Sequence, residues 1–242
     1  MNIKKYIPDT ITSMNVLCGT LGVIASFNGR QDLAFLLMIA ASVFDFFDGF
    51  AARALDAYSP LGKELDSLCD MVSFGVLPSV MLFNISAELH GGIDAWCFFP
   101  MLIVIFSALR LAKFNIDERQ TLNFIGLPTP ACAVVCCSLV YYVTKSPDSF
   151  LHTWVAGKVF VPVISVVLAY LLISEIPMFS MKMKKGEKSY TAIHRLRIAF
   201  FGCVLASTVF TIVCGLNWSM IALISFTAYI ILNVAHAILG NK

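Results

Sequence analysis

Eight long apolar stretches, separated by short polar connections, constrain the fold of this chain more than any other feature. A bilayer core of about 30 Å needs roughly 20 mostly apolar residues per helix. Only 13% of the residues are charged, whereas soluble domains carry about a quarter. We therefore predict an all-α, polytopic integral membrane bundle of about eight transmembrane helices. The stretches lie at about 11–27, 33–55, 65–85, 93–114, 128–144, 155–176, 196–214 and 216–239.

The distribution of lysine and arginine indicates how these helices are oriented. With a cytoplasmic N-terminus, fourteen of the 17 basic side chains fall on the cytoplasmic side, and Arg30, Lys145 and Lys158 fall outside. Cytoplasmic loops of membrane proteins carry such an excess of Lys and Arg. We therefore expect both termini in the cytoplasm. The net charge of +2 is too small to indicate a nucleic-acid partner.

The basic segment 180–197 is the longest connection and the one internal boundary that the sequence indicates. We expect residues 1–180 to form a six-helix core. Residues 181–242 would add a basic cytoplasmic loop and two further transmembrane helices.

The cysteines and histidines indicate no chemistry by their spacing. The eight cysteines lie mostly within apolar runs, and no Cys or His group has the spacing of a zinc site. Each of the four histidines, His90 among them, lacks an evident partner in the sequence. We expect the cysteines to pack as small apolar side chains.

Residues 44–70, where the second apolar stretch ends and the third begins, are unusually rich in acidic residues. This segment carries six of the 15 acidic residues. On a helix, residues at i, i+3, i+4, i+7 and i+8 share one face. Asp56 and Glu64 fall off the shared faces and are expected near water. The first face holds Asp45, Asp48, Gly49, Ala52 and Arg53, and the second holds Gly62, Asp66 and Asp70.

The segment between these faces predicts a sharp reversal of the chain. Ser59 is suited to cap a new helix, and Pro60 suits its first turn. Two antiparallel helices would then direct two carboxylates each toward one another.

Four carboxylates near the membrane boundary need positive charge beside them. One Asp at a helix centre costs about 2.5–3.5 kcal/mol, and repulsion among four adds to this cost. Arg53 alone cannot offset four charges. Oxygen ligands suit Mg²⁺ or Mn²⁺, and four carboxylates can bridge two ions about 3.5–4 Å apart. We therefore predict a site for two such ions, with the ligands Asp45, Asp48, Asp66 and Asp70.

Small residues beside these carboxylates leave room for a bulky ligand. Gly49, Ala52 and Gly62 remove side-chain volume from the two faces. A metal-bound pyrophosphate with an attached base would fit such a space.

The pattern D-F-F-D-G-F-A-A-R-(8 residues)-G-K-E-L-D-S-L-C-D resembles the signature of the CDP-alcohol phosphatidyltransferases at every fixed position. Two further segments resemble the bacterial-type CDP-diacylglycerol–serine O-phosphatidyltransferases. These are IPDTITSMNVLCGTLGVIAS, at 7–26, and ALRLAKFNIDERQTLNFIGLPTPACA, at 108–133.

The resemblance implies an enzyme that moves a phosphatidyl group from CDP-diacylglycerol to L-serine and releases CMP. It implies a bacterial inner-membrane location among membrane lipids, with the active site facing the cytoplasm. Asp45, Asp48 and Asp66 would be the main metal ligands, and Asp70 would complete the site and act as general base. A homodimer is left open. The implied CDP-binding residues are Asp48, Gly49, Ala52, Arg53 and Gly62.

The acceptor site is less clearly marked. A serine carboxylate suits a basic residue with amide and hydroxyl groups nearby, so Arg110, Asn115 and Thr129 are the candidates. The excess of positive charge in cytoplasmic segments could by itself account for Arg110. Thr12 and Asn15, polar within an apolar stretch, either face the site or bond another helix.

Two alternative functions stay open at this stage. The same reaction could use glycerol 3-phosphate or inositol phosphate as acceptor, because nearby basic residues would suit a phosphate. A cation-coupled transporter would also bury carboxylates in the membrane, but the sequence shows no repeated half of the kind many transporters have.

Overall fold

The structure, a computed structural model, describes residues 6–117, 124–180 and 192–240. Within these ranges the chain is helical, apart from its connections and a two-stranded antiparallel ribbon of β1 (Phe124–Ile125) and β2 (Pro177–Met178). A π-helical segment, η2 (Met71–Val76), and a short 3-10 helix, η3 (Ala95–Phe98), interrupt the α-helices. The α-helices are α1 (Tyr6–Phe27), α2 (Gln31–Ala54), α3 (Pro60–Asp70), α4 (Leu77–Leu89), α5 (Met101–Ile116), α6 (Thr129–Lys145), α7 (Phe150–Ala156), α8 (Phe160–Ile173), α9 (Ala192–Val213) and α10 (Ser219–Gly240).

The predicted helical membrane architecture is confirmed, but the count of eight spans is not. Among the described residues, six helical segments are long and apolar enough to cross a bilayer, and seven if α7 and α8 form one span. The chain bends by 88° between α7 and α8, where Gly157 and Lys158 interrupt the apolar run. Helix α6 has only 17 residues. Hydropathy detects apolar length and not direction, so the bend was not predicted.

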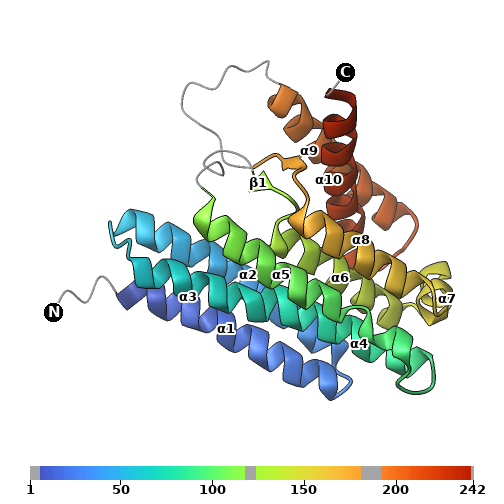
Figure 1. The fold of residues 1–242 in the computed structure, drawn as a ribbon. Coiled ribbons are helices and arrows are strands. Elements are labelled where there is room, and N and C mark those ends of the chain that lie inside the picture. The colour runs from blue at the N-terminus through green and yellow to red at the C-terminus, as the bar shows by residue number, and fades with distance from the viewer. Residues whose placement is uncertain (1–5, 118–123, 181–191, 241–242) are drawn as a thin grey trace.

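The helices form one bundle, with α9 and α10 inclined against it (Figure 1). Helix α1 packs on α2, α3 and α4, while α10 packs on α6 and α9. Buried side chains such as Phe35, Met38 and Met81 fill the core between α2, α4 and α6. The outer surface of α9 exposes Phe201 and Leu205. In a membrane protein such an apolar surface faces lipid, which fits the predicted surroundings.

The third span is continuous from α3 through η2 to α4, from Pro60 to Leu89. The π-helical turns begin at Met71, directly after Asp70. Single π turns within α-helices occur frequently at functional sites because they shift the side chains that follow. The basic segment predicted at 180–197 falls largely on residues 181–191, outside the described residues.

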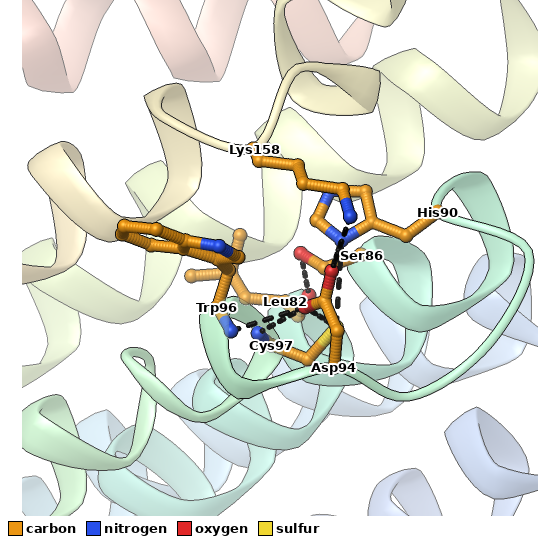
Figure 2. Close-up of polar contacts among 7 residues, drawn as sticks. All are labelled: Leu82, Ser86, His90, Asp94, Trp96, Cys97 and Lys158. Atoms are coloured by element: carbon orange, nitrogen blue, oxygen red, sulfur yellow. Dashed lines mark hydrogen bonds and ion pairs between the residues drawn. The ribbon is translucent and has the colours of Figure 1, made fainter.

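The structure gives His90 partners that were not evident in the sequence. Its Nδ1 lies 3.3 Å from Asp94 Oδ2 and 3.6 Å from Cys97 Sγ (Figure 2). The turn between α4 and η3 brings these three residues together. Sequence spacing alone did not indicate this, because the fold of the turn decides which side chains converge.

Two glycines let α1 approach the third span closely. A Cβ at Gly19 would lie 2.9 Å from the Cα of Ser73, and one at Gly22 would lie 2.7 Å from Leu77 Cδ2. Small residues commonly allow such close helix packing in membranes. The approach also lets Ser73 Oγ donate a hydrogen bond to the Asn15 carbonyl oxygen at 3.0 Å.

We expect Gly19→Ala to destabilise the bundle by about 1–3 kcal/mol, because the new methyl group meets backbone that cannot move freely. The midpoint of thermal unfolding in detergent, followed by tryptophan fluorescence, measures the change. Gly202→Ala is the matched control, since a Cβ there meets nothing within 4 Å. Equal midpoints for the two variants would contradict the close packing of α1.

Candidate functional site

The site forms where the chain reverses between α2 and α3. Helix α2 closes with Asp56 in the left-handed region (φ 50°) and a hydrogen bond from Ala57 N to Ala52 O of 2.9 Å. Helix α3 begins with Pro60 after the cap residue Ser59, whose Oγ accepts from Gly62 N at 2.9 Å. Both predicted start signals are confirmed. The reversal sets α3 across a cleft from the last turns of α2.

Three of the four predicted aspartates converge across this reversal. Asp45 and Asp48 of α2 and Asp66 of α3 each offer a carboxylate oxygen within 4.8 Å of the others. Asp48 Oδ2 and Asp66 Oδ1 are buried and have no hydrogen-bond partner within the described part of the chain. Unpaired buried charge is costly, so these oxygens indicate a place for a cation. An all-oxygen donor set fits Mg²⁺ or Mn²⁺.

Asp70 lies beside the group of three carboxylates but is not part of it. It is buried at the end of α3, and its Oδ1 accepts a hydrogen bond from Asn15 Nδ2 at 3.2 Å. Asp70 interacts electrostatically with Asp45, Asp66 and Arg110. Of the two arrangements left open for Asn15, the structure therefore has it facing the site.

A cleft of about 570 Å³ opens beside the carboxylates, within the size range of ligand pockets. Thr12, Asp48 and Asp66 contribute to its wall. Gly49, Ala52 and Gly62, the predicted small residues, also line it. A Cβ at Gly49 would meet nothing within 4 Å, whereas one at Gly62 would lie 3.0 Å from Asp9 Oδ1.

Arg53 differs from the other predicted nucleotide-binding residues. It is exposed at the last turn of α2 and is not among the residues that line the cleft. Asp9, which the sequence reasoning overlooked, does line the cleft from the first turn of α1.

The structure brings together two of the three acceptor candidates. Arg110 Nη1 donates to Thr129 Oγ1 at 3.2 Å, and both residues are buried. Arg110 Nε has no hydrogen-bond partner among the described residues. Asn115 instead turns toward α3, where its Nδ2 donates to Ser67 Oγ at 2.9 Å.

Helix α10 supports the acceptor side through residues that the sequence reasoning did not identify. Tyr229 Oη donates to the Phe179 carbonyl oxygen at 3.0 Å, and Phe179 N donates to Asn233 Oδ1 at 2.9 Å. The segment they hold follows β2, which pairs with β1 directly before the turn at Gly126. Polar side chains in an otherwise apolar helix were the only signal in the sequence.

The comparisons with known proteins agree with this geometry. Residues 5–171 match the family model described as CDP-alcohol phosphatidyltransferase. The chain belongs to this family. The resemblance expected from the aspartate pattern is thus confirmed.

Several named relatives share much of the chain. A CDP-diacylglycerol–serine O-phosphatidyltransferase of Bacillus subtilis is 36% identical over 143 residues, which are 59% of this chain and 78% of the relative. An archaetidylserine synthase of Methanothermobacter thermautotrophicus is 34% identical over 152 residues, covering 60% of this chain and 63% of the relative. A CDP-diacylglycerol–serine O-phosphatidyltransferase of Mycobacterium leprae is 30% identical over 215 residues, or 83% of this chain and 67% of the relative.

We expect Asn15→Ala to lower phosphatidyltransferase activity by about 10- to 100-fold, the usual effect of removing a residue that orients a site carboxylate. Asp70→Asn should lower it by about 10² to 10⁴-fold, as for a lost general base. Because Asn15 would act through Asp70, the double variant should be little worse than Asp70→Asn alone.

Thr20→Val is the control on the same helix, since Thr20 is exposed and bonds only its own helix backbone, at Val16 O. Single-turnover rates for the four variants measure the coupling. Strictly additive losses would show that Asn15 does not act through Asp70.

Proposed function

We propose that this protein transfers the phosphatidyl group of CDP-diacylglycerol to L-serine and releases CMP and phosphatidylserine. The observation that carries the proposal is the convergence of Asp45, Asp48 and Asp66, with orphaned buried oxygens, beside a cleft lined by small residues. Membership of the family supports the donor class. The names of the Bacillus subtilis and Mycobacterium leprae relatives support serine as the acceptor.

In this proposal the three converging aspartates hold divalent cations of the Mg²⁺ or Mn²⁺ type, two at full occupancy. Such ions, when bound, polarise a pyrophosphate and offset the charge that develops on the leaving nucleotide. Gly49, Ala52 and Gly62 leave room for the cytidine nucleotide in the cleft. Arg53 would reach the phosphates from the exposed end of α2, and this role stays a prediction.

Asp70 is proposed as the general base. The serine hydroxyl oxygen forms the new bond to phosphorus, the bond from phosphorus to the CMP oxygen breaks, and Asp70 takes the hydroxyl proton. A carboxylate can accept this proton because the hydroxyl becomes acidic during attack. The Asn15 side chain holds Asp70 Oδ1 in place for this transfer.

Arg110 and Thr129 are proposed to bind the acceptor. A guanidinium can hold a carboxylate through two parallel hydrogen bonds, and Arg110 still has an unpartnered Nε among the described residues. Arg110 interacts electrostatically with Asp70, and we propose that a serine held by Arg110 presents its hydroxyl to this base. Asn115, already bonded to α3, is proposed to position α5 instead.

Serine-dependent release of CMP from CDP-diacylglycerol by the purified protein tests the proposed function. Turnover should require Mg²⁺ or Mn²⁺, cease with EDTA, which removes the ions, and be abolished in Asp66→Asn, which removes one of the three converging carboxylates. Lys145→Gln is a control, since Lys145 closes α6 and lies outside both the cleft and the carboxylate group.

Glycerol 3-phosphate, inositol phosphate and inositol are tested in parallel. If any of these compounds gives faster CMP release than serine does, that compound and not serine is the acceptor. Absence of CMP release with every acceptor would favour the transporter alternative.

We further propose a bacterial inner-membrane location with the site on the cytoplasmic side, and a catalytic core at 1–180 followed by two accessory helices. The family match, which ends at residue 171, supports this division. The excess of positive charge supports the orientation, since Lys63 lines the cleft, whereas Lys158 lies between α7 and α8, at the opposite end of the bundle (Figure 1).

Single-cysteine labelling in a background without native cysteines tests this orientation. Tyr58, beside the cleft, is 68% exposed, and Ile93, at the other end of the bundle, is 67% exposed. A membrane-impermeant maleimide should label Ile93→Cys in intact cells and label Tyr58→Cys only after permeabilisation. The reverse pattern would overturn the orientation.

A further inference from the structure

A second group of metal-ligating side chains lies at the end of the bundle opposite the aspartates. His90 follows the last turn of α4, Asp94 caps η3, and Cys97 lies within η3. Figure 2 shows the three side chains directed toward one another, with Lys158 reaching in from the bend between α7 and α8. Roughly 30 Å of helix, about 20 residues at 1.5 Å each, separate this group from Asp70.

The distances within the group are those of atoms that share one metal ion. Cys97 Sγ lies 3.6 Å from His90 Nδ1 and 3.2 Å from Asp94 Oδ1, and His90 Nδ1 lies 3.3 Å from Asp94 Oδ2. Zinc binds sulfur at about 2.3 Å and nitrogen or oxygen at about 2.0–2.2 Å, so tetrahedral ligand atoms lie about 3.3–3.7 Å apart. The two Asp94 distances are to different carboxylate oxygens, so this carboxylate would turn slightly to bind an ion through one of them. One ligand atom from each of the three residues already lies within 4.8 Å of the other two.

The protein around this group buries His90 and Cys97 and leaves part of Asp94 accessible to solvent. The His90 side chain is 1% exposed and Cys97 is fully buried, whereas the Asp94 side chain is 26% exposed. Asp94 Oδ1 accepts hydrogen bonds from Trp96 N at 3.0 Å and Cys97 N at 3.2 Å, which orient the carboxylate. The Lys158 ammonium holds the pKa of Asp94 well below its usual range, so the carboxylate is ionised at neutral pH.

Lys158 would compete with a metal ion for the Asp94 carboxylate. Its Nζ lies 3.0 Å from Asp94 Oδ2, so without a metal ion the ammonium neutralises the carboxylate. The Lys158 side chain is 58% exposed and follows Gly157 at the break between two helices, so it can turn into solvent. An ion pair with Lys158 requires only Asp94 and does not explain why a histidine and a buried thiol also converge on this carboxylate.

We propose that His90, Asp94 and Cys97 form a binding site for a divalent transition metal ion of the zinc class. His90 binds through Nδ1, Asp94 through one carboxylate oxygen, and Cys97 through sulfur after its proton passes to solvent. A water molecule completes four ligands on the exposed side. Nitrogen and sulfur ligands favour zinc-class ions, whereas the all-oxygen aspartate cluster favours Mg²⁺ or Mn²⁺. The ion would tie the end of α4 to the start of the next span.

Titration of the purified full-length protein with Co²⁺, in excess Mg²⁺ to occupy the aspartates, tests this site. Co²⁺ bound to a thiolate gives a charge-transfer absorption band, which oxygen ligands do not produce. We expect the band to saturate at one Co²⁺ per chain and to be displaced by Zn²⁺. Absence of the band in the unmodified protein would overturn the proposal, whatever the variants show.

Variants then assign the band to particular residues. Cys97→Ser should abolish it, and His90→Gln should weaken Co²⁺ binding at least 10-fold. Cys69→Ser is the control, because Cys69 is the cysteine beside the aspartates, and it should leave the band unchanged. Lys158→Met should tighten Co²⁺ binding several-fold by removing the competing ammonium. Persistence of the band in Cys97→Ser, or weaker binding in Lys158→Met, would contradict the assignment.

Discussion

Carboxylates buried together inside a membrane protein are the constraint on which the candidate site of this structure depends. Asp48 and Asp70 are buried, and unpaired oxygens of Asp48 and Asp66 lie inside the bundle. Such a cluster is unfavourable unless positive charge is added to it, because membrane-embedded charge is poorly solvated. The sharp reversal between α2 and α3 concentrates these groups. The carboxylates therefore destabilise this part of the fold, and bound divalent cations would offset their charge.

The rest of the bundle holds this reversal in position from several sides. Helix α1 approaches closely through Gly19 and Gly22 and brings Asn15 to Asp70. On the far side, α10 fixes the segment after β2, and the short β-ribbon connects that segment to the turn before Thr129. In this arrangement, helices that carry no recognisable motif still determine where the proposed acceptor residues lie.

The two ends of the bundle differ in chemistry as well as in position. One end offers oxygen ligands from two helices, α2 and α3, next to a cleft with room for a nucleotide. The other offers a histidine, an aspartate and a thiol from one short turn, with a lysine as competitor (Figure 2). If both groups bind ions, the difference in ligand type would favour Mg²⁺ or Mn²⁺ at the aspartates and a zinc-class ion at the turn.

The sequence by itself determined the membrane class, the aspartate pattern and the start of α3. Each of these depends on neighbouring residues: apolar length, a spacing of three and four, and a cap at Ser59 followed by proline. Tertiary structure alone decided that Asn15 meets Asp70, that Arg110 meets Thr129 while Asn115 turns away, and that His90 meets Cys97. It also decided the bend before α8. These outcomes depend on how helices rotate and pack against each other, and spacing along one chain does not contain that information.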